Sequence, residues 1–76
     1  MQAGDKIRIL RRLKGHSQEY MAEKLGITQG AYGKIERGES DITLTRLGEI
    51  AAILNVTPVD ILIFDPKAFL NPISEN

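Results

Sequence analysis

The chain has 76 residues, no cysteine and a formal net charge of zero, so it holds one small domain without disulfides or thiolate metal sites. One histidine cannot build a histidine metal cluster, and no apolar run approaches the roughly 20 residues of a membrane span. The first ten residues turn charged and periodic at once, unlike a secretory signal. We therefore expect a soluble, cytoplasmic protein without a metal, another cofactor or a membrane partner.

The two halves of the chain differ in charge. Residues 1–37 hold eight basic and four acidic groups, whereas residues 38–76 hold two basic and six acidic groups. This asymmetry is typical of a molecule with one side that faces a polyanion. A solvated charged surface whose two halves differ by chance explains the asymmetry equally well. The charge distribution determines the electrostatic field around the protein and does not reveal the fold.

The pattern predicts helices and no strand. Helices are expected at about residues 5–14, 17–25, 28–37, 43–54 and 58–64, starting at the caps Asp5, Ser17, Thr28, Thr43 and Thr57. Short loops between them indicate a compact all-α domain over residues 1–64. Residues 65–76, with two prolines and little periodicity, are expected to form an extended or disordered tail.

Two apolar patterns should line the core. In the first helix Ile7, Leu10 and Leu13 recur at three-residue spacing. The fourth helix carries a continuous apolar stripe that comprises Leu44, Leu47, Ile50, Ala51 and Leu54. In the third helix we expect Tyr32 to belong to the core.

The second and third helices are joined by about three residues, Gly26-Ile27-Thr28, a connection typical of a helix-turn-helix. In that arrangement the second helix of the pair lies in the major groove of DNA, and its N-terminal residues reach base edges. Gln29 carries a donor and an acceptor that suit adenine, and Lys34, one turn further, can reach guanine or phosphate. The start of the preceding helix, Ser17-Gln18, suits a phosphate.

These residues resemble the phage repressor and Cro type of helix-turn-helix, also called XRE-like. The resemblance covers about residues 7–62 and is carried by LRRLKGHSQEYMAEKLGITQGAYGKIERGE and TRLGEIAAILNVTPVDIL. It implies a five-helix repressor-like domain, with a phosphate contact from Gln18, which also helps to fix Gln29. It further implies base contacts from Gln29, Gly30 and Lys34, and an ion pair between Arg11 and Glu36 beside the DNA backbone.

Three features depart from the family pattern. Gly30 and Gly33 stand where polar side chains are usual, so direct reading of bases should be sparse. These glycines either let the helix approach the bases closely, or are tolerated at exposed positions at about 1 kcal/mol each. The loop over residues 39–42 is acidic, so only its backbone N–H groups are expected to contact DNA. Tyr20 replaces a polar residue, and its hydroxyl is a candidate phosphate contact.

The remaining basic residues of the first helix and the turn after it have either structural or DNA-binding roles. Arg11 is first a structural partner of Glu36 and second a candidate phosphate contact. His16 is expected to be an exposed turn residue. The side chains of Arg8, Arg12 and Lys14 are expected to be solvated and to raise the local potential.

An apolar cluster in the fifth helix, Val59, Ile63 and Phe64, exceeds what one small core needs. Core packing explains at least half of it, but we favour a homodimer interface in which Phe69 and Leu70 of the tail also take part.

We therefore expect a transcriptional regulator that binds double-stranded DNA sequence-specifically, as a dimeric repressor on a pseudo-palindromic operator. One alternative is an antitoxin whose tail holds a toxin. Another is a protein-interaction module that has lost DNA binding, which the zero net charge and the two glycines allow. No nucleophile–base pair or phosphate loop can be read, so we do not expect an enzyme.

Overall fold

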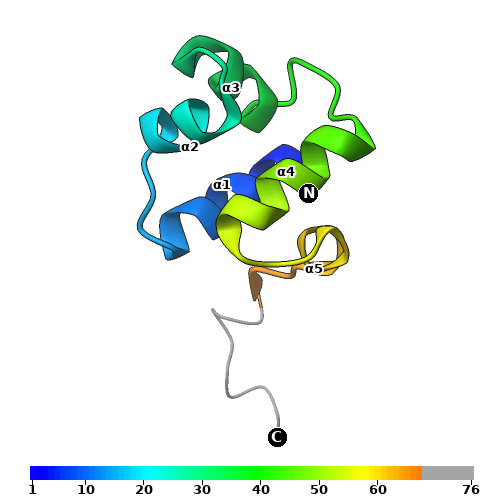
Figure 1. The fold of residues 1–76 in the computed structure, drawn as a ribbon. Helices are drawn as coiled ribbons and strands as arrows, with labels where there is room; N and C mark the ends of the chain where they lie inside the picture. The colour runs from blue at the N-terminus through cyan, green and yellow to red at the C-terminus, as the bar shows by residue number, and fades with distance from the viewer. Residues whose placement is uncertain (68–76) are drawn as a thin grey trace, which may run out of the picture.

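The computed structural model describes residues 1–67, and in this range the chain forms five α-helices and no strand (Figure 1). Their bounds are Ala3–Leu13 (α1), Gln18–Leu25 (α2), Gln29–Glu36 (α3), Leu44–Leu54 (α4) and Pro58–Ile63 (α5). The longest of them, α1 and α4, have 11 residues each, too few to cross a bilayer. Most of the predicted tail, including Phe69 and Leu70, lies outside the described residues.

Local capping chemistry sets most of the helix boundaries. Ser17, Thr28, Thr43 and Thr57 each accept a hydrogen bond from the backbone N–H three residues ahead, at 2.9–3.0 Å. Such a bond satisfies one of the N–H groups that the first helical turn leaves unpaired. At the other end of α2, Gly26 adopts the left-handed conformation (φ 72°), which stops the helix and turns the chain toward α3.

The start of α1 differs from the prediction. The helix begins at Ala3, with Gln2 as its N-cap, and the Asp5 carboxylate accepts a hydrogen bond from the Gln2 N–H at 3.2 Å. Asp5 therefore stabilises the first turn from inside the helix. The extra turn packs tightly, because a Cβ on Gly4 would lie 2.5 Å from the backbone oxygens of Ile35 and Glu36. Only a glycine lets α1 approach the end of α3 this closely.

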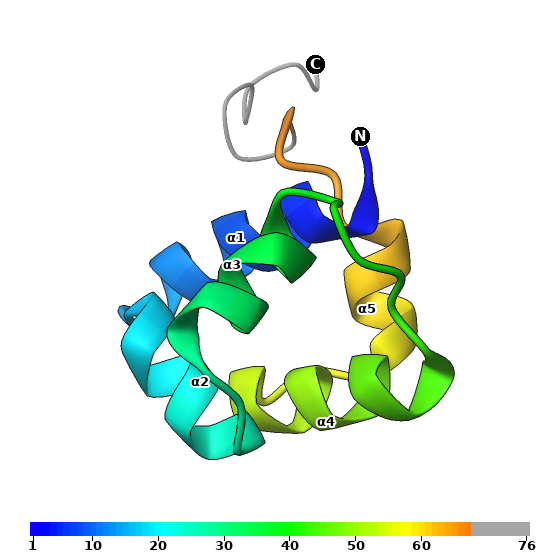
Figure 2. The same ribbon diagram turned by 90° about the horizontal axis from the view of Figure 1, so that it is seen from above.

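The helices enclose one core. Contacts run in a ring in which α1 packs against α3 and α5, and α4 packs against α2 and α5, while α2 meets α3 (Figure 2). Side chains from all five helices fill the centre of this ring, and the most deeply buried apolar ones are Ile7, Met21, Tyr32, Ile50, Leu54 and Ile61. Tyr32 is thus a core residue, as predicted.

Two leucines assigned to the core are exposed. Leu13 is the last residue of α1 and Leu44 is the first residue of α4, and both side chains face solvent. Helical spacing predicts the direction of a side chain but not whether a neighbouring element extends far enough to cover it. The predicted stripes are therefore correct in their centres and wrong at these two ends.

Candidate nucleic-acid interface

The helix-turn-helix is built by α2 and α3, which lie together on the side of the molecule away from α5 (Figures 1 and 2). After Gly26, the Ile27 N–H donates to the Ala22 carbonyl at 3.0 Å, and the Ile27 side chain packs against the core. This anchor leaves Thr28 free to cap α3. The turn is therefore held from both sides, which fixes the direction in which α3 starts.

One side of α3 is buried and the other is open. Tyr32, Ile35 and Glu36 face the core, whereas Gln29, Gly30 and Lys34 are exposed. The predicted base-contacting residues thus share an outward surface and take no part in the packing of the domain. This exposure is the geometric condition for a helix that enters a groove of DNA.

A buried carboxylate ties three helices together beneath this surface. Glu36 is only 2% exposed and accepts from Nε and Nη2 of Arg11, at 2.7 and 3.1 Å. It also accepts from the Tyr32 hydroxyl at 2.5 Å and from Nε2 of Gln18 at 3.0 Å. The remaining Arg11 nitrogen, Nη1, donates to the His16 carbonyl at 3.0 Å. The predicted Arg11–Glu36 pair is present, within a larger network.

This network keeps its charges although it is shielded from water. Burial by itself raises the pKa of Glu36, but hydrogen bonds from Arg11, Tyr32 and Gln18 outweigh it and lower the pKa below its ordinary value. The hydrogen bond to Glu36 raises the pKa of Arg11, against the opposing effect of burial. Burial, followed by the bond to Glu36, raises the pKa of Tyr32. Glu36 is therefore an anion and Tyr32 a neutral donor at neutral pH.

The residues predicted at the start of α2 have structural partners. The Ser17 hydroxyl caps α2 by accepting from the Tyr20 N–H at 2.9 Å. Gln18 is half-buried and held by Glu36, and within residues 1–67 no hydrogen bond joins it to Gln29. The expected link from Gln18 to Gln29 is thus replaced by one to Glu36, whose lone pairs face the amide from the end of α3.

Tyr20 and His16 form a stacked pair. Their ring centroids lie 4.4 Å apart, and Nζ of Lys24 lies 5.6 Å from the Tyr20 centroid. The two rings shield one another, so His16 is half-buried and not the exposed turn residue that was expected. Tyr20 is itself half-buried, and this stacking restricts where its hydroxyl can point.

The two glycines of α3 have different environments. Gly30 is exposed, and nothing lies within 4 Å of a Cβ built there. Gly33 is buried, because the Arg37 guanidinium covers it. The interpretation of both glycines as tolerated exposed positions is therefore wrong for Gly33. Arg37 was not among the predicted site residues, although its place four residues after Gly33 on the same helix is a signal that could have found it.

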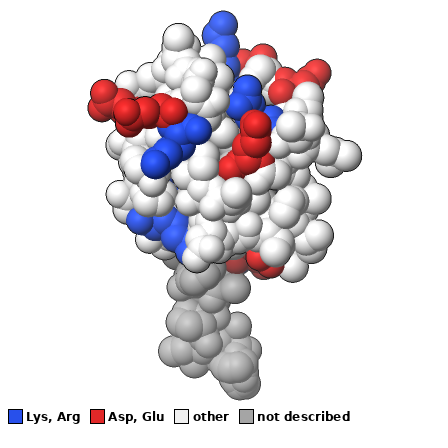
Figure 3. Space-filling model, in the orientation of Figure 1, with Lys and Arg blue, Asp and Glu red and all other residues white. Residues whose placement is uncertain are grey.

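Charges of both signs mix on the surface. Figure 3 shows lysines and arginines next to acidic side chains on one face, without a uniformly basic area. Three surface ion pairs occur within residues 1–67: Arg8–Asp5, Arg37–Glu39 and Arg46–Glu49. Of these three pairs, only Arg37–Glu39 joins the two halves of the sequence, and the other two leave the net charge of their half unchanged.

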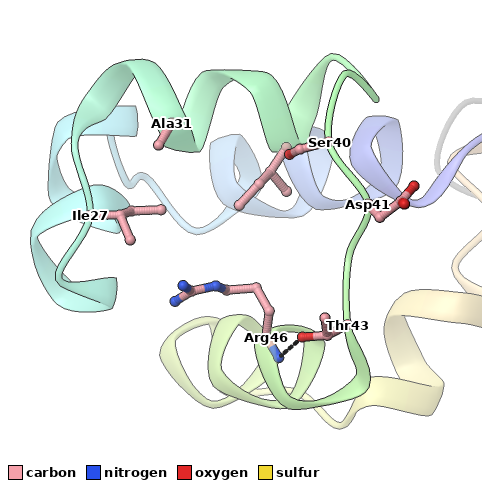
Figure 4. A pocket seen from close by; sticks show the side chains of 7 residues that line it. Ile27, Ala31, Ser40, Asp41, Thr43 and Arg46 are labelled. Atoms are coloured by element: carbon pink, nitrogen blue, oxygen red, sulfur yellow. Dashed lines mark hydrogen bonds between the residues drawn. The ribbon is translucent and has the colours of Figure 1, made fainter.

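A groove separates α3 from the start of α4 (Figure 4). Ile27, Ala31 and Asp41 are among its lining residues, and the Arg46 side chain extends across it toward the end of α2. There Nη1 of Arg46 donates to the Leu25 carbonyl at 3.5 Å. Arg46 thus spans the gap between α4 and the helix-turn-helix, and the acidic loop lies along one edge of the groove.

The apolar residues of α5 divide into two kinds. Ile61 is fully buried, and Phe64 is half-buried against the core. Val59 and Ile63, by contrast, are 60% and 70% exposed. Core packing therefore accounts for Phe64 in part but not for Val59 and Ile63, which stay open to a partner.

The sequence matches the family model HTH_3, described as helix-turn-helix, over residues 7–61. The chain belongs to this XRE-type helix-turn-helix family. The chain is 41% identical over 54 residues to the SPbeta prophage-derived HTH-type transcriptional regulator YonR of Bacillus subtilis, covering 71% of this chain and 50% of YonR. The chain spans half or less of the length of the first curated relatives that it matches.

Solved structures of the same family share the fold. The restriction-modification controller C.AhdI from Aeromonas hydrophila is 32% identical with a TM-score of 0.73, over 78% of this chain and 89% of that one. The biofilm regulator SinR, solved in complex with DNA, is 29% identical with a TM-score of 0.72, over 80% and 98%. These likenesses confirm the all-α fold, and the family and its relatives are transcriptional regulators and not enzymes.

Proposed function

We propose that this chain is a DNA-binding transcriptional repressor that places α3 in the major groove of a pseudo-palindromic operator. The observation that carries the proposal is the outward surface of α3, where Gln29 and Lys34 are exposed and unused by the core. Membership of a family of transcriptional regulators supports it, as does the solved complex of SinR with DNA.

Base reading is assigned to the first two turns of α3. The Gln29 amide can donate to and accept from one adenine, and Lys34 can donate to guanine or to phosphate. Gly30 lies between them with open space in front of its backbone, so a base or a thymine methyl group can approach closely. Two long side chains and one bare backbone position then carry the direct contacts.

Phosphate contacts are assigned to the start of α2. Gln18 gives one amide hydrogen to Glu36 and retains a second for a phosphate, and the network holds the amide in place. The hydroxyls of Ser17 and Tyr20 are the other candidates. We assign Arg11 to the structural pair and not to phosphate, because it is 6% exposed and Glu36 and a backbone carbonyl hold its three nitrogens.

The repressor is proposed to act as a homodimer through α5. Val59 and Ile63 present exposed apolar side chains that a second copy would cover. Two copies would place their α3 helices in successive major grooves, with half-site centres about 34 Å apart. Sedimentation of the chain and of a Val59→Ser, Ile63→Ser double variant tests this arrangement. We expect the unaltered chain to sediment as a dimer and the double variant as a monomer. An unaltered chain that sediments as a monomer would contradict the interface.

The central test is the selection of bound sites from a random DNA pool, followed by titrations at several salt concentrations. We expect a symmetric site, with affinity that falls steeply as salt rises. Gln29→Ala should lose discrimination at particular base pairs by about 1–3 kcal/mol, whereas Gln18→Ala should weaken binding to all sequences alike. Equal losses on operator and random DNA for Gln29→Ala would defeat its assignment.

A pool that yields no preferred sequence, even at low salt, would favour a protein-interaction module instead. The antitoxin alternative depends on a tail of which residues 68–76 lie outside the described range. Co-purification of a second protein would point to it.

A further inference from the structure

The Arg37 side chain lies over Gly33, the second glycine of α3, so that the glycine acts as a seat for the guanidinium. A Cβ built on Gly33 would lie 2.9 Å from Nη1 of Arg37, closer than real Cβ atoms lie to other heavy atoms. Arg37 follows one helical turn later, and long side chains on a helix lean toward its N-terminus. The guanidinium therefore occupies the space that any larger residue at position 33 would fill. Gly30 has no such neighbour, since nothing lies within 4 Å of a Cβ built there.

Glu39 holds the same guanidinium from the other side. Gly38 adopts a left-handed conformation (φ 75°), and the Glu39 N–H donates to the Lys34 carbonyl at 2.8 Å, which turns the chain back beside α3. The Glu39 carboxylate then accepts from Nε of Arg37 at 2.8 Å and from Nη2 at 3.4 Å. Arg37 and, to a smaller extent, Lys34 lower the pKa of Glu39, so all three charges lie near one another.

Within residues 1–67, this pairing leaves Nη1 of Arg37 and the second N–H of Nη2 without a hydrogen-bond acceptor. A guanidinium has five N–H groups in a rigid plane, and Glu39 takes the edge formed by Nε and Nη2. The parallel N–H groups of Nη1 and Nη2 remain, and this pair matches the O6 and N7 acceptors of guanine. Glu39 also offsets the positive charge of Arg37, which weakens its attraction to phosphates in general and favours a directional pair of acceptors.

The position of the guanidinium places it among the proposed base readers. Gln29, Gly33 and Arg37 lie on successive turns along one side of α3, because residues four apart share a face of a helix. A side chain that folds back from Arg37 over Gly33 points toward Gln29. It therefore adds a third polar group to the surface that Gln29 and Lys34 present.

We propose that Arg37, seated on Gly33 and aligned by Glu39, reads a guanine in each half-site of the operator. The inference rests on the proposed DNA-binding function. It gives Gly33 a role in specificity, because the glycine leaves the space in which the Arg37 side chain lies when it reads the DNA.

The test starts from the operator that the unaltered chain selects from a random DNA pool. Binding is then titrated against operators substituted one base pair at a time. Arg37→Lys keeps the charge but lacks the planar fork, and Gly33→Ala places a methyl group where the guanidinium lies. Gly48→Ala is the matched control. It too replaces a helical glycine with alanine, but it lies on α4, and nothing lies within 4 Å of the new Cβ.

We expect the unaltered chain to prefer a G·C pair at one position in each half-site. Arg37→Lys and Gly33→Ala should each reduce this preference by about 5- to 150-fold, the range of one good bidentate base contact. Gly48→Ala should retain it. Thermal melting of Gly33→Ala should occur no lower than for the unaltered chain, since alanine favours the helix, and this separates lost reading from lost folding.

Three results would overturn the inference. Arg37→Lys could weaken binding to operator and to random DNA by the same factor and leave the base preference unchanged. That result would make Arg37 a phosphate contact and leave the proposed function intact. If Gly33→Ala kept the full G·C preference while Arg37→Lys lost it, Gly33 would have no role in positioning Arg37. An unaltered chain that selects no sequence would overturn the proposed function itself, and this inference with it.

Discussion

The substitution Glu36→Gln tests how much of the stability depends on one buried charge. Glutamine keeps the shape of the side chain but loses the negative charge that faces Arg11, and its NH₂ group would face donors from Arg11 and Gln18. The side chains of Arg11 and Glu36 are only 8% and 1% exposed, so water cannot replace the lost partner. Breaking such a pair from one side costs about 3–5 kcal/mol.

This loss is large for so small a domain. A chain of 76 residues has a free energy of unfolding of about 4–11 kcal/mol at the usual stability per residue. With a urea dependence of about 1 kcal/mol per molar, the unfolding midpoint should fall by about 3–5 M. Far-UV circular dichroism is the suitable probe, because the chain has no tryptophan and is largely helical.

Glu39→Gln is the matched control, since it removes the partner of another arginine at an exposed site. Its midpoint should stay close to that of the unaltered chain, because exposed ion pairs contribute little. In an Arg11→Gln background, Glu36→Gln should also cost much less than it does alone, which measures the coupling between the two residues. Equal midpoints for Glu36→Gln and Glu39→Gln would refute the reasoning that burial makes this pair essential.

Two further predictions concern the same region. Because folding lowers the pKa of Glu36, its contribution to stability is complete above the ordinary value of about 4.5 and is lost as the pH falls below it, toward the pKa in the folded state. The difference in unfolding free energy between the unaltered chain and Glu36→Gln should therefore be constant from pH 5 to 7 and shrink in acid. Gly4→Ala forces a methyl group against the backbone oxygens of Ile35 and Glu36 and should destabilise the domain by about 1–3 kcal/mol in urea titrations, whereas Gly48→Ala should not.

Local chemistry made much of the fold predictable. Ser17, Thr28, Thr43 and Thr57 cap helices by bonds to residues three positions away, so a short stretch of sequence contains both partners. Asp5 shows the limit of this reasoning. An acid can stand at the N-cap or three residues later within the first turn, and the packing of a distant helix end decides between them.

The candidate site was predictable where a role depends on the direction of a helix face. Gln29 and Lys34 are exposed, as their spacing indicated. Contacts between elements were not predictable from spacing within one helix, as the bond from Gln18 of α2 to Glu36 of α3 shows. The family resemblance supplied the Arg11–Glu36 pair, which no local pattern would have revealed.

The buried carboxylate of α3 divides its helix into residues that are free to change and residues that are not. Gln29, Gly30 and Lys34 are exposed and make no contact that the packing of the domain needs, so evolution can vary them without unfolding the protein. Glu36 serves Arg11, Tyr32 and Gln18 together, so a change there alters several helices at once. Mutations on this one surface can thus change what it contacts while the scaffold below is inherited unchanged.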